Sequence, residues 1–324
     1  MTQPPHKPSE PADGRVADAV ADNWVDRHAP AGLRPLLRLS RADRPAGTWL
    51  LLLPCLWCIA LGAAATGGWS LQAAWIAIGC GIGAFLMRGA GCTWNDLADV
   101  EFDASVARTR SRPLPSGQVT RRQARLWMVA QALMAFAILL TFPPLAIGLG
   151  ILSLVPVAIY PFAKRFTWWP QVFLGIAFNW GALLGWAAVA GNVGPASISF
   201  YLAGIAWTLF YDTIYAHQDK EDDALIGVRS TARLFAERTE LWLMRFLILA
   251  VILAGLGVIL ALIDANPLSL LLGLVGVWGF GLHLFWQLRQ LDIDDPAGCL
   301  RLFRSNRDAG LILAAFLGAA ALVA

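Results

Sequence analysis

Charged residues are scarce in this 324-residue chain: Asp, Glu, Lys and Arg make up 15% of it, whereas 57% is hydrophobic. A soluble domain carries about a quarter charged residues, so the deficit excludes an ordinary soluble enzyme and predicts a membrane protein. A helix needs about 20 apolar residues to cross the hydrocarbon core. A window of that length predicts an all-α bundle of nine spans, at 46–66, 70–93, 124–142, 144–163, 171–190, 197–216, 241–263, 267–288 and 309–324.

Basic residues are missing from one set of turns. None of the 25 Lys and Arg residues lies in the turns near 66–69, 142–145, 190–197 and 264–267. Basic loops stay on the cytoplasmic side of a membrane, so the N-terminus is expected inside and, after nine spans, the C-terminus outside. The net charge of +3 is small beside this asymmetry, and no nucleic-acid partner is expected.

An early apolar run is missing as well, which excludes a cleaved signal peptide. Residues 1–30 are rich in Pro, Ala and Asp and predict a disordered cytoplasmic tail, followed by one intramembrane domain at 31–324. A mitochondrial presequence is poor in acids, whereas this tail contains several. They are Glu10, Asp13, Asp18, Asp22 and Asp26. The sequence therefore favours a multi-pass protein of a bacterial inner membrane over a mitochondrial one.

Cysteine and histidine are few and form no ligand cluster in the sequence. The chain has five cysteines and four histidines. Cys55 and Cys58 have the CxxC spacing, but they lie in a span without a partner pair, which favours packing over metal or redox chemistry. The stretch "GCGIG" at 79–83 is not preceded by a strand, so its glycines are better explained by close helix packing than by nucleotide binding.

Acids are concentrated where the second span ends, in "CTWNDLADVEFDASVARTRSRPLPSG" at 92–117. Asn95, Asp99 and Asp103 are spaced four residues apart. If the helix of the second span continues, they form a stripe along one face with neighbouring Cβ atoms about 6 Å apart.

A second acidic cluster, "YDTIYAHQDKEDD" at 211–223, follows the sixth span. Asp219 and Asp223 are again four apart, and Asp212 lies seven residues before Asp219, inside the apolar run. Both clusters end spans on the same, cytoplasmic side. They are therefore expected to face one cavity.

The energetics of these acids favour a bound cation. Two carboxylates about 6 Å apart repel by roughly 3 kcal/mol at an effective dielectric near 20, so they must protonate, pair with bases or bind metal. A single cluster is equally consistent with a solvated acidic loop. Two matched clusters, with Asp212 inside a span, favour a site of oxygen ligands, which suits Mg²⁺.

Basic residues flank the same mouth of the bundle. They are Arg108, Arg110 and Arg112 after the first cluster, Lys164 and Arg165 at the end of the fourth span, and Arg229 after the second cluster. The orientation rule alone accounts for basic residues on this side. Acids and bases together nevertheless predict a phosphorylated ligand, with its oxygens shared between metal, lysine and arginine.

Arg88 lies inside the second span, seven residues before Asn95. At 1.5 Å per residue it is about 10 Å deeper on the same helical face. A charge inside a span is costly and functional by default. Arg88 is expected either to pair with an acid such as Asp212 or to bind an anionic group of a co-substrate.

Several blocks of the sequence resemble the UbiA family of intramembrane prenyltransferases. "NDLADVEFD" resembles one aspartate motif of the family and "DTIYAHQDKEDD" the other. The similarity is greatest to the branch that prenylates 4-hydroxybenzoate. It extends from Arg41 to Thr231 through the blocks "RADRPAGTWLLLLPCLW", "MRGAGCTWND", "RTRSRPLPSG", "YPFAKRFTWWPQ" and "YDTIYAHQDKEDDALIGVRST".

The resemblance implies a role for each matching residue. Mg²⁺ and the diphosphate of a polyprenyl donor would be held by six polar residues: Asn95, Asp99, Asp103, Asp212, Asp219 and Asp223. Arg112 and Lys164 would contact the diphosphate with help from Arg108 and Arg229, and Arg88 would bind the carboxylate of 4-hydroxybenzoate. Arg44, Asp96 and Tyr160 also match family positions. Some relatives have Lys where this chain has Arg229.

The resemblance also implies a fold and a reaction. The fold is a nine-helix bundle around a central cavity open to the cytoplasm and, laterally, to lipid. The reaction ionises the polyprenyl diphosphate with the help of Mg²⁺, and the ring carbon ortho to the hydroxyl of 4-hydroxybenzoate attacks the allylic cation. This transfer is a step of ubiquinone synthesis.

Three other functions would account for parts of the same pattern. Another branch of the family would use dihydroxynaphthoate, homogentisate or haem as the acceptor. A cation-coupled transporter would also place acids in the membrane, but it predicts inverted repeats, whereas the two acidic motifs share one orientation. A membrane scaffold gives no reason for six aligned Asn and Asp residues together with Arg88.

Overall fold

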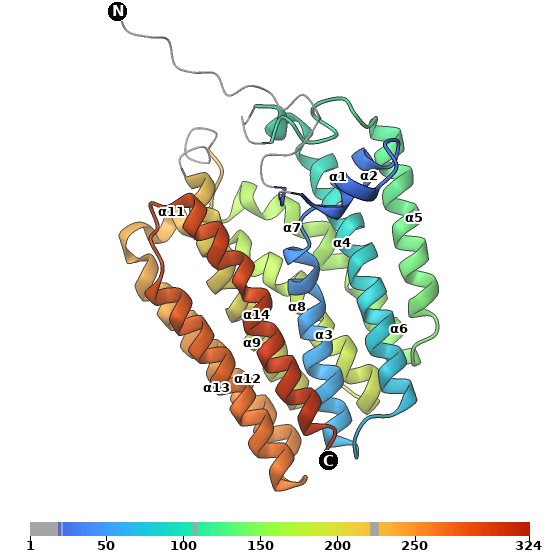
Figure 1. The fold of residues 1–324 in the computed structure, drawn as a ribbon, viewed down its shortest axis with the longest axis vertical. Helices are drawn as coiled ribbons and strands as arrows, with labels where there is room; N and C mark the ends of the chain where they lie inside the picture. The colour runs from blue at the N-terminus through green and yellow to red at the C-terminus, as the bar shows by residue number, and fades with distance from the viewer. Residues whose placement is uncertain (1–18, 21, 106–108, 221–226) are drawn as a thin grey trace, which may run out of the picture. The chain divides into compact units, whose positions relative to one another are not determined.

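The computed structural model of the chain describes residues 19–20, 22–105, 109–220 and 227–324. All regular structure in these ranges is helical, and they contain no strand. The longer helices are α3 (Ala46–Ala65), α4 (Leu71–Ser105), α5 (Arg121–Leu139), α6 (Pro144–Leu152), α7 (Leu154–Phe166), α8 (Pro170–Ala190), α9 (Pro195–Ala216), α12 (Thr239–Leu262), α13 (Pro267–Arg289) and α14 (Pro296–Ala320) (Figure 1). The short ones are α1 (Trp24–His28), α2 (Arg34–Leu39), η1 (His217–Asp219), α11 (Thr231–Phe235) and η2 (Ala236–Arg238).

Six helical segments in the described residues are long and apolar enough to cross a membrane. They are Ala46–Ala65, Leu71–Ala104, Pro144–Phe166, Pro170–Ala190, Thr231–Leu262 and Pro267–Arg289. The all-helical membrane class predicted from composition is therefore confirmed. The other three predicted spans coincide with α5, α9 and α14, which do not meet the same criterion. Arginines occupy the first turns of α5 and the first half of α14.

The predicted span at 144–163 is interrupted in the structure. Helix α6 ends at Leu152 and α7 begins at Leu154, with Ser153 between them. Pro156 explains the break, because proline has no N–H to donate to the carbonyl four residues earlier and its ring crowds that carbonyl. The apolar length still suffices for one crossing from Pro144 to Phe166.

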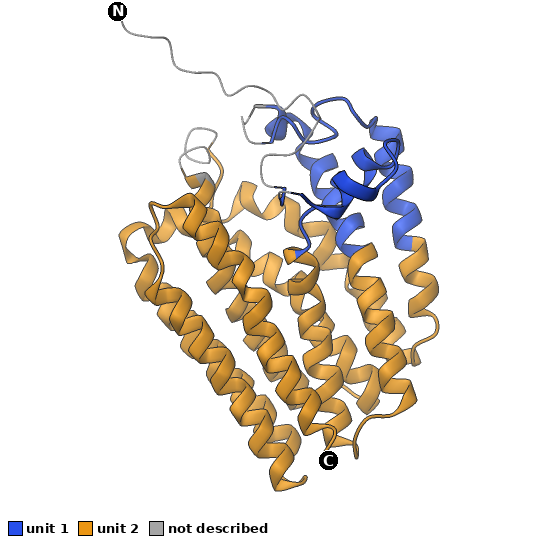
Figure 2. Cartoon of the chain, viewed as in Figure 1, with its two compact units in different colours: residues 1–45, 87–132 blue, residues 46–86, 133–324 orange. Residues whose placement is uncertain are grey.

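The described residues divide into two compact units (Figure 2). Unit 1 is formed from residues 1–45 and 87–132, and unit 2 from residues 46–86 and 133–324. Residues 1–18 and 21 of the predicted tail lie outside the described residues, and α1 lies near the end of that tail. The predicted boundary at residue 30 therefore stays a prediction.

The core of unit 2 is held by close helix packing and aromatic contacts. Helix α3 packs on α8, where a Cβ added at Gly185 would lie 2.7 Å from the carbonyl oxygen of Cys55. The fully buried Trp57 contacts the rings of Phe200 and Trp207. Its indole N–H donates to the carbonyl of Gly310 at 2.8 Å. Small residues and satisfied polar groups of this kind hold helices together where lipid removes the hydrophobic driving force.

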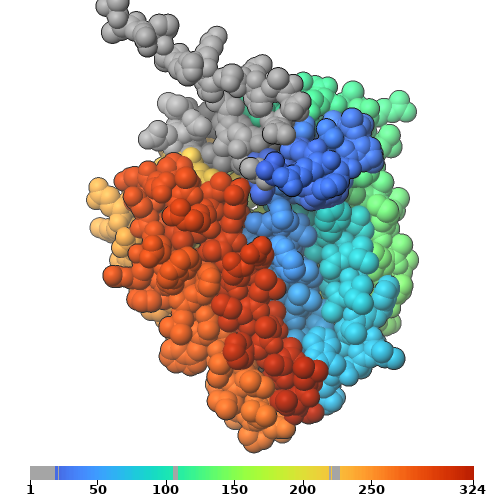
Figure 3. Space-filling model, in the orientation of Figure 1, coloured from blue at the N-terminus to red at the C-terminus, as the bar shows by residue number. Residues whose placement is uncertain are grey.

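Within unit 2, α13 packs against both α12 and α14. This C-terminal part of the chain forms the orange-to-red surface of Figure 3. Helix α12 is apolar on every side. Leu247 and Ala250 are buried, whereas Ile252 is 60% exposed and Leu256 is 44% exposed. Exposed large apolar side chains on so apolar a helix are typical of a surface that contacts lipid.

Unit 1 contains α1, α2, the C-terminal part of α4 from residue 87, the loop after it and the start of α5. A small apolar core joins α2 to this loop and to α5, through Leu39, Leu114, Val119 and Ala124. Polar ties add to it: Trp127 of α5 donates to Ser40 at 2.8 Å, and Ser40 donates to Gln131 at 3.1 Å. These contacts fix the loop that carries Arg112.

Candidate active site

The first acidic motif lies on α4, which continues without a break to Ser105. The predicted continuation of this helix is therefore confirmed, and Asn95, Asp99 and Asp103 occupy successive turns of one face. Asp99 is 1% exposed and Asp103 is 7% exposed, while Asn95 is half-buried. Burial makes these carboxylates expensive unless cations accompany them.

Arg112 supplies one such cation from the loop after α4. Its Nη1 lies 3.0 Å from Oδ1 and 2.9 Å from Oδ2 of Asp103, and 3.5 Å from Oδ1 of Asp96. The loop turns back toward α4 because Thr109 donates its hydroxyl to the carbonyl of Asp103 and accepts the N–H of Arg112 at its own carbonyl. The structure thus brings together two residues predicted for the site, Asp103 and Arg112.

Asp96 has a second basic partner, which was not singled out in the sequence. Its Oδ1 accepts a charge-assisted hydrogen bond of 2.5 Å from Nη2 of Arg41. Asp96 is fully buried and Arg41 is 7% exposed. The signal for Arg41 was present in the block "RADRP", where a base stands just before an apolar span, but nothing in the sequence indicated its partner 55 residues away.

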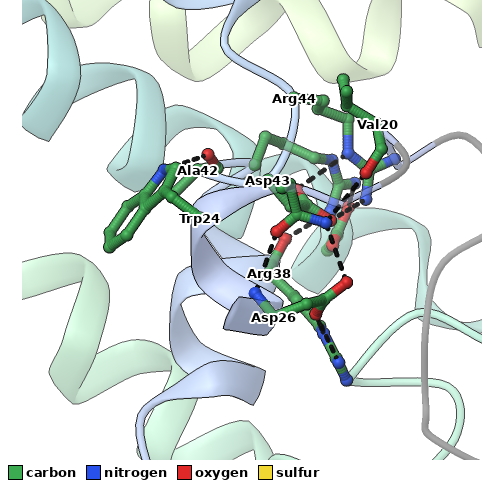
Figure 4. Close-up of polar contacts among 10 residues, drawn as sticks. Val20, Trp24, Asp26, Arg38, Ala42, Asp43 and Arg44 are labelled. Carbon is green, nitrogen blue, oxygen red and sulfur yellow. Dashed lines mark hydrogen bonds and ion pairs between the residues drawn. The ribbon is translucent and has the colours of Figure 1, made fainter. Parts of the chain in front are cut away.

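Arg44 lies in the same N-terminal segment and contacts its neighbour Asp43. Its Nε is 3.1 Å from Oδ1 and its Nη2 3.2 Å from Oδ2 of that residue (Figure 4). Asp43 is 1% exposed. Burial raises the pKa of Asp43 to about 6, although Arg41 opposes the shift. The segment is also held by the indole of Trp24, which donates to the carbonyl of Ala42 at 2.9 Å.

Arg88 lies two turns before Asn95 on α4 and is half-buried. The next residue, Gly89, is required by close packing, because a Cβ there would lie 2.0 Å from Oε1 of Gln131 on α5. The backbone of α4 next to Arg88 is therefore closely packed against Gln131 of α5. Its partner stays a prediction, whether an acid or a substrate carboxylate.

Two predicted diphosphate contacts, Lys164 and Arg229, lie together in unit 2. Lys164 is in the last turn of α7, and its carbonyl accepts the N–H of Arg229 at 3.4 Å. Nη1 of Arg229 donates to the carbonyl of Phe166 at 3.0 Å. The guanidiniums of Arg229 and Arg233 lie 5.7 Å and 5.4 Å from the ring centroid of Trp168. Main-chain and cation–π contacts hold these bases at the end of α7.

The second acidic motif begins on α9 and continues into η1. Asp212 is half-buried in the last turns of α9, and Asp219 ends η1. The side chain of Asp219, together with Arg108 and Asp223, lies outside the described residues. Tyr160 is half-buried on α7. The predicted meeting of the two acidic motifs in one cavity stays a prediction.

The described carboxylates fit a hard cation shared with a ligand. Among the described residues, no three His, Cys, Asp or Glu side chains converge closely enough to hold a metal ion by themselves. Mg²⁺ takes one or two carboxylates and completes its shell with water and substrate phosphates. The oxygen donors of Asn95, Asp99 and Asp103 suit that chemistry. The buried Oδ2 of Asp96 has no hydrogen-bond partner in the described part of the chain, so the site keeps acceptor capacity.

Fold and site together define a helical membrane protein in which buried carboxylates pair with guanidiniums where α4 ends. The profile of the UbiA prenyltransferase family matches residues 51–317. The chain belongs to the UbiA prenyltransferase family. The resemblance inferred from the aspartate motifs is thereby confirmed.

Relatives of known name agree with the predicted branch. The chain is 46% identical over 297 residues to the 4-hydroxybenzoate polyprenyltransferase, mitochondrial, of Bos taurus, which covers 91% of this chain and 76% of the relative. It is 45% identical over 324 residues to the human protein of the same name, with coverage of 98% and 82%.

Solved structures share the fold. A UbiA homologue from Aeropyrum pernix K1 superposes with a TM-score of 0.68 at 23% identity, over 83% of this chain and 96% of that one. A UbiA homologue from Archaeoglobus fulgidus, bound to GPP and Mg²⁺, gives a TM-score of 0.63 at 19% identity, over 90% and 100%. A structure of the Archaeoglobus fulgidus homologue bound to Cd²⁺ matches with a TM-score of 0.61.

The comparisons correct the predicted location. A bacterial inner membrane was expected, but the relatives that match nearly the whole chain are named mitochondrial. The physical reason for the error is that both membranes demand the same apolar length and the same charge bias. Only the acids of residues 1–30 distinguished the two, and a short tail is a weak signal.

Proposed function

We propose that this chain transfers a polyprenyl group from polyprenyl diphosphate to the ring carbon ortho to the hydroxyl of 4-hydroxybenzoate, a step of ubiquinone synthesis. The observation that carries the proposal is the buried cluster of Asp99, Asp103 and Arg112 at the end of α4. The names of relatives at 46% and 45% identity support the same reaction and the same acceptor.

The acids would hold Mg²⁺ on the diphosphate. Bound Mg²⁺ would supply Lewis-acid stabilisation of the charge that develops on the leaving diphosphate. The residues proposed to hold it are Asn95, Asp99 and Asp103 on α4 and Asp212, Asp219 and Asp223 of the second motif. Structures of a UbiA homologue with the same fold, bound to Mg²⁺ with GPP or DMAPP, support this proposal.

The bases would neutralise the charge on the diphosphate oxygens that do not contact the metal. Arg112 is suited to this because Asp103 and Asp96 fix its Nη1, while its buried Nε has no partner among the described residues. Lys164 and Arg229 are suited because main-chain contacts hold them side by side. Arg108 is proposed to join them. Fixed donors of this kind stabilise charge without reorganising as the bond breaks.

The transfer breaks two bonds and forms two. The C1–O bond of the allylic diphosphate breaks, and diphosphate leaves with the electron pair. The ring carbon ortho to the hydroxyl would bond to C1, and the same ring carbon would then release its proton to the departed diphosphate, which restores the aromatic ring. The apolar walls of unit 2 serve this step, since water excluded from them cannot trap the allylic cation.

Arg88 is proposed to bind the carboxylate of 4-hydroxybenzoate, and Arg44 and Tyr160 are proposed to assist in substrate binding. A guanidinium matches a carboxylate in geometry and charge. Arg88 lies deeper along α4 than the metal-binding acids, two turns from Asn95. An acceptor held there would present its ring toward the donor.

The membrane arrangement completes the proposal. All nine predicted spans would cross, with α5, α9 and α14 joining the six segments that are apolar enough on their own. The basic loops and the N-terminus would face the inner compartment of a mitochondrial inner membrane. The cavity would open to that side and laterally to lipid, where the polyprenyl tail resides.

Transfer to labelled 4-hydroxybenzoate by purified protein in detergent tests the proposal directly. Geranyl diphosphate serves as donor, with Mg²⁺ or with EDTA. We expect metal-dependent product, and a loss of about a hundredfold or more in kcat for Asp99→Ala. For Arg88→Ala we expect a rise in KM for 4-hydroxybenzoate that exceeds the rise for geranyl diphosphate.

Glu101→Gln is the matched control, because Glu101 is exposed on the same helix between the two acids. It should keep full activity. A folded protein that prenylates dihydroxynaphthoate or homogentisate but not 4-hydroxybenzoate would contradict the acceptor and leave the family intact. A protein that prenylates no aromatic with any allylic diphosphate would contradict the proposed function.

A further inference from the structure

We propose that Arg41 is a positioning residue for diphosphate binding, acting through Asp96 on Arg112. The inference rests on the proposed role of Arg112. In this proposal Arg41 acts through its contact with Asp96 and not on the ligand itself. It fixes the carboxylate that helps to hold Arg112 in place.

The main-chain conformation of Arg41 is the first reason. Helix α2 ends at Leu39, and Arg41 follows with φ at +58°. The N–H of Arg41 donates to the carbonyl of Arg38, and the N–H of Ala42 donates to that of Leu37, both at 3.0 Å. This is the pattern of a Schellman motif, whose left-handed position is usually glycine.

An arginine at such a position is strained, because its Cβ crowds the following carbonyl. Strain of this kind persists where the surroundings hold the residue, and it concentrates at functional sites. The backbone of Arg41 would be better served by glycine. The side chain therefore must supply what glycine cannot.

The contacts of the side chain show what it supplies. Nη2 of Arg41 bonds Oδ1 of Asp96 at 2.5 Å, and the same oxygen lies 3.5 Å from Nη1 of Arg112. That Nη1 in turn bonds both carboxylate oxygens of Asp103 at 3.0 and 2.9 Å. The four side chains alternate in charge, base and acid, from Arg41 to Asp103.

This alternation determines where Arg112 lies. Asp96 is fully buried, so its charge must be compensated nearby. Arg41 forms the short bond to Asp96. Arg112 therefore lies farther from Asp96 and bonds the carboxylate of Asp103. Without Arg41, Asp96 would have Arg112 as its remaining basic contact, and the guanidinium would be drawn from Asp103 toward Asp96.

The competing explanation is a purely structural ion pair, and unit 1 offers a matched control. Arg38 and Asp26 form another buried pair at 2.7 Å, with side chains 6% and 8% exposed (Figure 4). Arg38 lies three residues before Arg41, in the last turn of α2. Arg38→Gln therefore reports the effect of losing a buried ion pair from this segment.

The test measures binding of geranyl diphosphate with Mg²⁺ by titration in detergent, alongside thermal stability and both KM values. We expect Arg41→Gln to raise the Kd about tenfold and Arg41→Lys to raise it about threefold, with the KM for 4-hydroxybenzoate unchanged within twofold. Arg41→Gly separates the two explanations, since glycine adopts φ near +58° without strain. It should raise the Kd as Arg41→Gln does while losing less thermal stability.

Two further measurements complete the test. In an Arg112→Ala background, Arg41→Gln should change the Kd by less than twofold, because the residue it positions is gone. Arg38→Gln should lower thermal stability and leave the Kd unchanged. Effects of Arg41 and Arg112 that multiply independently, or an Arg41→Gln variant whose Kd equals that of Arg38→Gln, would overturn the inference.

Its failure is distinguishable from failure of the proposed function. Binding is measured without an acceptor. A chain that binds geranyl diphosphate but prenylates nothing would contradict the proposed reaction, and the Kd values of the variants would still decide whether Arg41 positions Arg112. A chain that binds no geranyl diphosphate overturns both.

Discussion

Trp207 on α9 donates its indole N–H to the side-chain oxygen of Asn306 on α14 at 2.8 Å. Both residues are fully buried. The amide of Asn306 donates in turn to the side chain of Gln287 on α13 at 3.1 Å. One asparagine thus links three helices of unit 2, among them the helix that carries Asp212.

We expect Asn306→Ala to lower the free energy of unfolding by about 2–4 kcal/mol, because it leaves the indole N–H of Trp207 buried without an acceptor. Thermal unfolding in detergent measures the loss. Asn192→Ala is the control: Asn192 also accepts an indole N–H, from Trp186 at 3.2 Å, but it is exposed. Its loss should cost less than about 1 kcal/mol. Equal effects would show that the buried link contributes nothing special.

Gly185→Ala should destabilise the packing of α8 on α3 by about 1–3 kcal/mol, because the added Cβ would lie 2.7 Å from the carbonyl oxygen of Cys55. Gly148→Ala on α6 is the matched control, since nothing lies within 4 Å of its Cβ position. Alanine there should be neutral or stabilise the helix by up to about 1 kcal/mol. Melting temperatures of the two variants test the prediction. A Gly185→Ala variant as stable as Gly148→Ala would contradict it.

Asp43 predicts a pH dependence of stability. Burial raises its pKa to about 6, from an ordinary value near 4. Between these values the folded protein keeps a proton that the unfolded chain has released. The free energy of unfolding therefore falls as pH rises from about 4 to 6, by roughly 3 kcal/mol, and Asp43 adds no further change above pH 6.

Asp43→Asn should flatten this part of the stability profile, because an amide does not titrate. Thermal unfolding of both proteins in detergent, at intervals from pH 4 to pH 7, supplies the comparison. The slope is decisive, since the substitution also alters the contacts of Asp43 with Arg44. An unchanged slope in the variant would assign the pH dependence to other groups.

Trp168 should matter to the donor more than to the acceptor. Its ring contacts the guanidiniums of Arg229 and Arg233. A cation–π contact at a partly exposed site contributes about 0.5–1 kcal/mol. We therefore expect Trp168→Ala to raise the KM for the polyprenyl diphosphate about two- to fivefold, and Trp168→Phe to restore most of the loss.

Phe162→Leu is the control for Trp168, because Phe162 forms a similar contact with Arg165, at 5.1 Å, in the last turns of the preceding helix α7. It should leave both KM values unchanged. Steady-state kinetics with each substrate varied in turn measures the difference. A rise in the KM for 4-hydroxybenzoate of the same size in Trp168→Ala would instead indicate a general disturbance of the connection between α7 and α8.

The local features of the site followed from the sequence. The four-residue spacing of Asn95, Asp99 and Asp103 predicts one helical face, and α4 provides it. The membrane class followed from composition, and the family from its ordered motifs. Helix geometry and apolar length are properties of short segments, so a linear pattern suffices to predict them. Proline is a local signal of the same kind: Pro156 marks the break at Ser153, which the apolar length alone does not show.

The contacts between distant segments were decided by the tertiary structure. Arg41 and Asp96 are 55 residues apart, and Trp207 and Asn306 are 99 apart. Helices such as α12 are apolar on every side, because lipid and protein interior are equally apolar neighbours. Their sequences consequently carry no hydrophobic stripe that marks which face packs inward. Which acid meets which base depends on that packing, and therefore emerges only when the helices are assembled.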